Sequence, residues 1–154
     1  MKQAGYQTFR VSHDFHFGFS ENILGFDQGF DENELFVEAT ENDGMTLDRR
    51  IADRAAELVR AHASHRFFGW VYFASPHEPY YARYDDMPGG TDAERYGQEV
   101  RFMDEAVGVV VAALRDAGIY DKTIVIVTAD HGEELGDHGG KGHKTLHAEC
   151  THVP

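Results

Sequence analysis

One short apolar run that ends abruptly in charged residues and glycine constrains this chain most. Residues 124–127 are all isoleucine or valine, and Asp130, His131 and Gly132 follow almost at once. A β-branched run bounded in this way predicts a central strand of a parallel sheet, here at residues 123–128. Ligands bind beyond the carboxyl ends of the strands in open α/β sheets. The pattern therefore puts a carboxylate and an imidazole where such folds do chemistry.

The rest of the chain alternates strand and helix patterns. In chain order we expect a helix end, a strand, a helix, a strand and a helix, at residues 1–5, 7–12, 47–64, 67–74 and 92–117. Thr46 suits an N-cap, and Gly5 and Gly118 suit positions just after a helix. Residues 13–42 are aromatic and acidic and contain several glycines, so we interpret them as a long irregular segment, an excursion with short pieces of structure. The alternation predicts an α/β fold with parallel strands and one domain over residues 1–154.

Charge and composition exclude some classes of function. The chain carries 27 acidic and 14 basic residues, a formal net charge of −13. Nucleic-acid binding requires basic patches that release counterions, so we expect no nucleic-acid partner. An anionic substrate is compatible with the charge, because a metal ion and local cations can override the global field. No apolar run is long enough to span a membrane.

Asp130 and His131 are the first candidates for chemistry. Divalent cations accept carboxylate oxygen and neutral imidazole nitrogen, and Gly132 allows the sharp turn that would bring adjacent residues to one ion. The alternative interpretation is that Asp130 caps a helix and His131 packs locally. His77 is the next candidate, since it follows the other apolar run between two prolines that stiffen its loop. It could donate a hydrogen bond to an anionic ester or protonate a leaving group, or else be a surface histidine.

Several segments together resemble the sulfatase family of the alkaline phosphatase superfamily. Residues 124–132 resemble that family's strand followed by S/T-x-D-H/N-G, and residues 75–80 resemble its PHxPY segment. Residues 2–6 resemble its LKEAGY helix end, and residues 25–31 its GFD turn. Residues 151–154 resemble the segment that enters the next strand. These collinear matches cover nearly the whole chain. The resemblance implies an alkaline-phosphatase-like three-layer sandwich with a mostly parallel central sheet, incomplete in this chain.

The resemblance also implies roles for individual residues. It implies metal ligation by Asp130 and His131, and contact of His77 with the sulfate or phosphate of the substrate. Many members have an active-site lysine thirteen residues after the metal-binding aspartate, where this chain has His143 followed by Lys144. Either side chain would stabilise negative charge or protonate the leaving oxygen. The alternative for Lys144 is a solvated loop cation.

The implied activity is hydrolysis of sulfate esters, on an anionic substrate that is a sulfated or phosphorylated small molecule or glycan. Calcium is the family's usual metal, and manganese or zinc could take its place. The formylglycine nucleophile arises in a C/S-x-P-x-R segment, and the one cysteine, Cys150, does not fit it. We therefore interpret the chain as an internal piece of such an enzyme, inactive alone. Its uncovered sheet edges are expected to favour association.

Two further functions stay open. One is a phosphonate or phosphodiester hydrolase, or a phosphoglycerol transferase, of the same superfamily. The second is a non-catalytic metal-binding remnant. Among nearby residues, Glu133 and His138 could tune a metal from outside its ligand shell, whereas Glu134, Asp137 and Lys141 are interpreted as solvated. The spacing of His13, Asp14 and His16 could bind a metal, but surface or loop packing is favoured.

Overall fold

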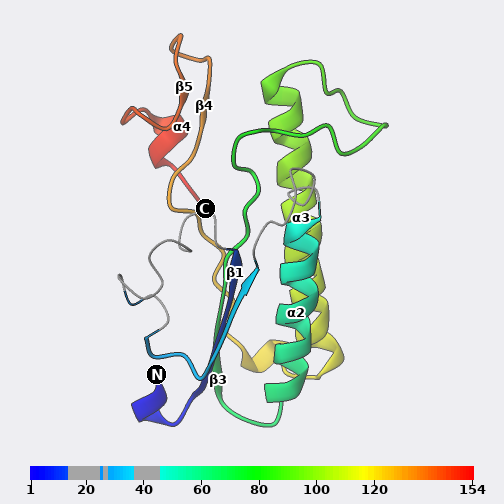
Figure 1. Cartoon of the computed structure of the whole chain (residues 1–154), viewed down its shortest axis with the longest axis vertical. Coiled ribbons are helices and arrows are strands. Elements are labelled where there is room, and N and C mark those ends of the chain that lie inside the picture. The colour runs from blue at the N-terminus through cyan, green and yellow to red at the C-terminus, as the bar shows by residue number, and fades with distance from the viewer. Residues whose placement is uncertain (14–24, 26–27, 37–45) are drawn as a thin grey trace.

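A computed structural model of the chain describes residues 1–13, 25, 28–36 and 46–154 (Figure 1). In chain order its elements are η1 (Lys2–Ala4), β1 (Gln7–His13), β2 (Glu32–Phe36), α2 (Leu47–His62), β3 (Phe67–Val71), α3 (Asp92–Asp116), η4 (Tyr120–Lys122), β4 (Glu134–Leu135), β5 (Lys141–Gly142) and α4 (Ala148–Thr151). The predicted helix end, two strands and two long helices before residue 120 are confirmed within a few residues. The five-residue strand β2 is a short piece of structure within the predicted excursion. Asp14 and His16 lie outside the described residues.

The main sheet has the order β2-β1-β3, and both pairs are parallel. The central strand β1 is buried from Thr8 to His13, as expected for a parallel strand covered on both faces. Gly69 in β3 pairs with Phe9 in β1 and leaves room for its ring, since a Cβ on Gly69 would lie 2.4 Å from Phe9 Cζ. The predicted α/β class with a parallel sheet is confirmed.

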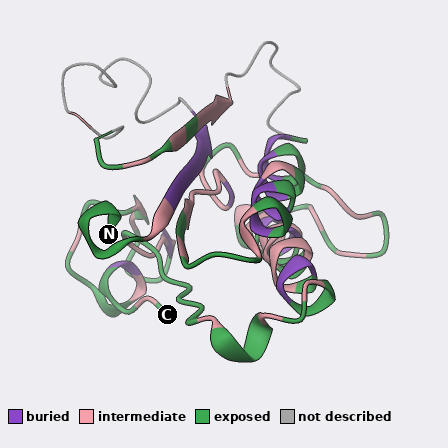
Figure 2. Cartoon of the chain, turned by 90° about the horizontal axis from the view of Figure 1, so that it is seen from below, coloured by how far each residue is buried: buried purple, intermediate pink, exposed green. Residues whose placement is uncertain are grey.

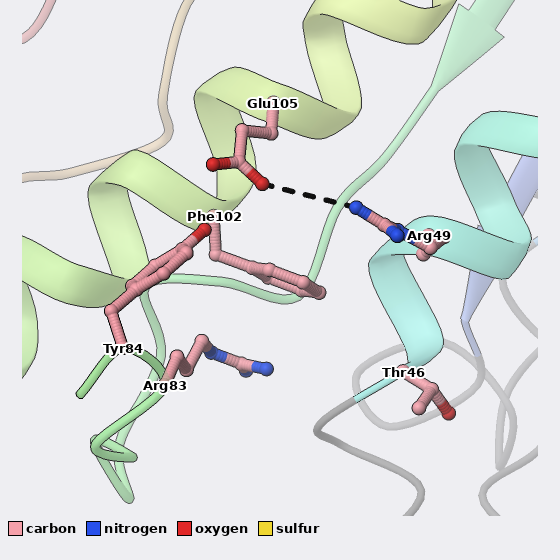
Figure 3. A pocket seen from close by; sticks show the side chains of 6 residues that line it. All are labelled: Thr46, Arg49, Arg83, Tyr84, Phe102 and Glu105. Carbon is pink, nitrogen blue, oxygen red and sulfur yellow. Dashed lines mark ion pairs between the residues drawn. The ribbon is translucent and has the colours of Figure 1, made fainter. Parts of the chain in front are cut away.

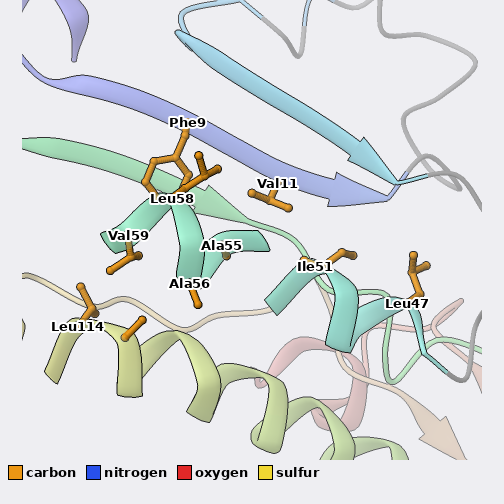
Figure 4. Close-up of a cluster of buried hydrophobic side chains, with 10 residues drawn as sticks. Phe9, Val11, Leu47, Ile51, Ala55, Ala56, Leu58, Val59 and Leu114 are labelled. Carbon is orange, nitrogen blue, oxygen red and sulfur yellow. The ribbon is translucent and has the colours of Figure 1, made fainter. Parts of the chain in front are cut away.

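The two long helices lie on the same side of this sheet (Figure 1). Helix α2 packs on β1 and β3, and α3 packs on α2. The buried side chains between them come from one strand and two helices (Figure 4), and they are Phe9, Val11, Leu47, Ile51, Ala55, Ala56, Leu58, Val59, Ala113 and Leu114. Buried residues concentrate in β1 and on the facing sides of the helices (Figure 2). The described residues thus build the sheet and one helical layer of the sandwich.

The two helices begin differently. Thr46 precedes α2, but its side chain makes no capping hydrogen bond. Thr91 instead forms a full capping box with Glu94 at the start of α3, a signal that the T-x-x-E spacing offers and the sequence interpretation missed. Gly5 and Gly118 follow their helices with φ of 78° and 68°, as predicted. Neither helix, nor any other in the described ranges, is long and apolar enough to cross a membrane.

The predicted strand at residues 123–128 is wrong. This segment has no strand hydrogen bonding, and its side chains face solvent, with Ile124 and Ile126 exposed by 89% and 80%. A strand is defined by the backbone bonds of a neighbour, and no strand among the described elements pairs with it. The β-branched pattern is present, but its pairing partner is absent from the described sheet.

Candidate functional site

The loop that carries His77 follows β3, and hydrogen bonds to the first turn of helix α2 hold the start of this loop. The Asp48 carboxylate, in the first turn of α2, accepts hydrogen bonds from the backbone N–H groups of Ala74 and Ser75 at 2.7 and 2.9 Å. Burial raises the pKa of Asp48, although these two N–H groups work in the opposite direction. The start of α2 therefore fixes where the chain exits the sheet, two residues before His77.

Helix α3 fastens the same loop through Glu99, which is 1% exposed. Its carboxylate accepts hydrogen bonds from the Ser75 hydroxyl, the Tyr81 backbone N–H and Arg83 Nε, each at 2.8 Å. The Arg83 side chain is 5% exposed, so this is a buried ion pair whose carboxylate also has neutral donors. These bonds hold the loop on both sides of His77.

The neighbouring side chain, Gln98, completes the attachment. Its Oε1 accepts a hydrogen bond from the backbone N–H of Tyr84 at 2.7 Å, and its Nε2 donates to the Pro88 carbonyl at 2.8 Å. Sequence reasoning missed Asp48, Gln98 and Glu99. Polar residues inside amphipathic helices were a signal in principle, but nothing local indicates which distant backbone groups they bind.

A cavity of about 240 Å³ lies beside this attachment, between the start of α2 and the middle of α3 (Figure 3). Its lining residues are Thr46, Arg49, Arg83, Tyr84, Phe102 and Glu105. The Arg83 guanidinium lies 3.9 Å from the centre of the Phe102 ring, and Arg49 pairs with Glu105 at 3.8 Å. None of the site residues predicted from the sequence lines this cavity.

A second cavity, of about 160 Å³, brings together all three residues predicted to be catalytic. His77 comes from the loop after β3, and His143 and Lys144 come from the segment after β5. The Nδ1–H of His77 donates a hydrogen bond to the Glu78 carbonyl at 2.6 Å, which fixes the orientation of the ring. Residues 77 and 143 are far apart in sequence, so their convergence is a property of the fold.

Glu133 is one of the acidic residues that line this second cavity. Its side chain is 8% exposed, and Oε1 lies 3.5 Å from His143 Nδ1. Burial raises the pKa of Tyr80, and the negative charge of Glu133 raises it further. Lys141, predicted to be solvated, is exposed but forms an ion pair with Asp92. Carboxylate, imidazole and ammonium groups therefore line the second cavity together.

Asp130 and His131 adjoin this cavity through His143, because the His131 and His143 rings stack with centroids 3.8 Å apart. The His131 Nδ1–H donates a hydrogen bond to the Gly132 carbonyl at 2.9 Å, and Nε2, the nitrogen that would ligate a cation, lies 3.7 Å from Asp130 Oδ2. Two atoms that each lie about 2.0–2.4 Å from one cation are about 3–4 Å apart. The donor set and its spacing therefore fit a divalent cation.

The Asp130 turn lies near the carboxyl end of β3. Burial raises the pKa of Tyr72, the residue after β3, and the charges of Asp130 and Asp48 raise it further. Tyr72 stacks on His13, the last residue of β1, with ring centroids 5.3 Å apart. His13 is fully buried, so it packs inside the fold rather than on its surface. The candidate site thus lies where the parallel strands end, as expected.

Gly132 brings the Asp130 turn against helix α4. Its N–H donates to the Cys150 carbonyl at 2.8 Å, and a Cβ on Gly132 would lie 2.0 Å from the Glu149 carbonyl oxygen. Glycine is therefore required here by the close approach of two backbones. Gly132 is not among the glycines with a positive φ, so its turn does not depend on left-handed backbone.

The profile of the family described as Sulfatase matches residues 1–154. The chain belongs to the sulfatase family. Steryl-sulfatase of Mus musculus is 35% identical over 125 residues, which are 78% of this chain and 20% of that protein. Arylsulfatase of Hemicentrotus pulcherrimus is 28% identical over 192 aligned positions, covering 93% of this chain and 34% of that protein.

The "Multifunctional alkaline phosphatase superfamily protein PehA" of Trinickia caryophylli is 42% identical over 52 residues, which are 34% of this chain and 10% of that protein. This sulfatase chain spans about a fifth of the length of the mouse relative. It carries the Asp130–His131 pair and the cavity lined by His77, His143 and Lys144.

Proposed function

We propose that this sulfatase chain forms the leaving-group and metal-binding side of an active site that hydrolyses sulfate esters. One observation carries the proposal: His77, His143 and Lys144 line one cavity, and His131 stacks on His143. The pair that fits a cation therefore adjoins the groups that can bind an anion and donate a proton. A bound divalent cation would neutralise the anionic ester and polarise its oxygen atoms.

His77 is proposed to bind the sulfate group. With Nδ1–H held by Glu78, its Nε2 must be protonated to donate a hydrogen bond to a sulfate oxygen. Lys144 adds a positive charge to the lining of the same cavity. Because fixed donors need no reorganisation when charge develops, such groups stabilise the transition state more than water does.

His143 is proposed to protonate the leaving oxygen. Glu133 Oε1, 3.5 Å from Nδ1, orients the ring so that Nε2–H can give up its proton as the ester bond breaks. Glu133 is a positioning residue in this scheme. The nucleophile is proposed to come from a C/S-x-P-x-R segment of a longer gene product.

The test uses the full-length gene product and two aryl sulfates with good and poor leaving groups. His143→Gln is expected to lower kcat about 10²-fold or more for the poor leaving group and much less for the good one, because only the former needs a proton. Asp130→Ala should lower both. Lys122→Ala, an exposed residue in η4, is the matched control and should change neither.

The second candidate substrate is a phosphodiester or phosphonate ester, which is also an anion. A relative described as a multifunctional protein of the alkaline phosphatase superfamily shares 42% identity with this chain over 52 residues. Parallel assays with an aryl phosphodiester decide between the two. A higher kcat/KM for the phosphodiester would replace the sulfate proposal. A folded, metal-loaded product that turns over neither ester would leave a non-catalytic remnant as the explanation.

A further inference from the structure

A second cluster of metal-ligating side chains lies apart from Asp130 and His131. His138 follows β4, His147 precedes α4, and Glu149 lies in α4. One ligand atom from each lies within 4.8 Å of the others. His138 Nε2 is 3.4 Å from Glu149 Oε2, and the rings of His138 and His147 are 4.0 Å apart at their centroids. The turn after β4 and the start of α4 thus converge on one point.

The buried carboxylate of Glu134 contacts two residues of this cluster. Glu134 was predicted to be solvated, but it is only 1% exposed; it accepts hydrogen bonds from the His138 backbone N–H at 3.2 Å and the Thr145 hydroxyl at 3.1 Å. Its Oε2 also lies 3.6 Å from His147 Nδ1. Metal-ligating histidines commonly donate their other ring N–H to a carboxylate, which fixes the ring orientation. Glu134 is placed to do this for His147.

The third ligand has an oxygen without a hydrogen bond. Glu149 Oε2 is removed from solvent and accepts none, and its ion-pair partner is His138 Nε2 at 3.4 Å. Buried carboxylate oxygens without a hydrogen bond are uncommon and ask for an explanation. A cation bound beside Glu149 would explain this oxygen, because Oε2 would ligate the cation together with the neighbouring imidazole nitrogens.

We propose that His138, His147 and Glu149 bind a zinc-like transition-metal ion. Two imidazoles and one carboxylate, with a fourth position open to water, are a donor set typical of zinc. Ligand atoms around a tetrahedral zinc ion lie about 3–3.5 Å apart. His138 and Glu149 already have that spacing, and a ligand atom of His147 lies within 4.8 Å of both, so a small shift of its side chain would complete the set. The ion would link the turn after β4 to α4, beside the candidate active site.

Calorimetric titration of the metal-stripped chain with zinc chloride tests this site. In the Asp130→Ala variant, which removes the other pair, one zinc ion per chain should still bind. Adding His147→Ala or Glu149→Gln should weaken that binding at least tenfold, whereas adding His65→Ala, an exposed histidine before β3, should not. Cobalt(II) in place of zinc should give the strong visible absorption of a tetrahedral site, lost in the same variants.

Two results would overturn the proposal. One is no zinc binding by the Asp130→Ala chain; the other is equal affinity with and without His147→Ala. Glu149→Gln keeps the size of the side chain and its N-terminal position in α4, so circular dichroism should confirm that this variant folds. Zinc should also raise Tm in the Asp130→Ala chain and leave the Tm of its Glu149→Gln derivative unchanged.

Discussion

The imidazole rings of His131 and His143 stack with centroids 3.8 Å apart and planes inclined by 24°. One residue belongs to the pair that fits a cation, and the other lines the cavity with His77 and Lys144. The segment between them folds back through β4 and β5, an antiparallel pair in which Glu134 is opposite Gly142. This short hairpin is therefore what places His143, the proposed proton donor, beside the Asp130–His131 pair.

The stacking predicts that a paramagnetic ion at Asp130 and His131 will affect both rings. Substoichiometric Mn²⁺ should broaden the imidazole NMR signals of His131 and His143 and leave His65, at the opposite end of β3, sharp. Asp130→Ala should restore the His131 signal because it removes the carboxylate ligand. Equal broadening of His65 would mean that the ion binds without preference for this turn.

Glu99→Ala is predicted to destabilise the chain strongly. It removes three hydrogen bonds from the loop and leaves Arg83 buried without its carboxylate, which typically costs about 3–5 kcal/mol. Urea unfolding should show the loss in the free energy of unfolding. Asp104→Ala, exposed on the same helix, is the matched control and should stay within about 0.5 kcal/mol of wild type. A similar small effect for Glu99→Ala would mean that the loop does not depend on α3.

The parts of the site that depend on local motifs could be predicted from the sequence. Asp130, His131 and His77 follow apolar runs. His143 is named only through the resemblance to the sulfatase family, many members of which have a lysine at that distance from the aspartate. Asp48 and Glu99 could not be found in this way. Their partners are backbone groups 26 to 27 and 18 residues away, and which N–H lacks a strand partner is known only once the sheet is built.

The same reasoning explains the wrong strand at residues 123–128. Hydrophobic period and β-branching report whether a segment can pair, and both are local. Whether it does pair depends on a neighbouring strand, which is a long-range property. By contrast, β1 and β3 were found because both have partners in the sheet. Helices α2 and α3 were found because their hydrogen bonds are internal.

The exposed run at residues 124–127 is predicted to make the isolated chain associate. Ile124 and Ile126 are almost fully exposed on a segment without a strand partner among the described elements, a template for pairing between molecules. Sedimentation velocity should show association that rises with concentration. The double variant Ile124→Lys, Ile126→Lys should shift the chain towards monomer, because charge on an edge opposes pairing. A wild-type chain that stays monomeric at high concentration would contradict this.

Asp31 is predicted to make stability depend on acid pH. Its carboxylate accepts hydrogen bonds from the Thr8 N–H and hydroxyl, both at 2.9 Å, and pairs with Lys2 at 2.8 Å. The Lys2 ammonium lowers the pKa of Asp31 most; partial desolvation raises it, and the Thr8 donors lower it further. Because the pKa of Asp31 is lower in the folded state, its contribution to stability is fully present at pH values above the unfolded-state pKa of about 3.9.

That stabilisation is lost as pH falls through the lowered pKa of folded Asp31. Urea midpoints measured from pH 6 to pH 2 should therefore drop more steeply below about pH 4 in wild type than in Asp31→Asn. Asp121→Asn, exposed in η4, is the control and should retain the wild-type slope. Parallel curves for wild type and Asp31→Asn would show that the contact with Thr8 and Lys2 does not form in solution.

Gly132→Ala is predicted to separate the Asp130 turn from α4. The added Cβ would lie 2.0 Å from the Glu149 carbonyl oxygen, and neither backbone can yield without losing the Gly132 N–H bond to Cys150. Overpacking of this kind costs about 1–3 kcal/mol. Gly108→Ala in α3 is the matched control, because its Cβ meets nothing within 4 Å and should stabilise the helix by up to about 1 kcal/mol. Since α4 carries Glu149, Gly132→Ala should also weaken zinc binding, and a variant with wild-type stability and zinc affinity would show that this backbone contact is not formed.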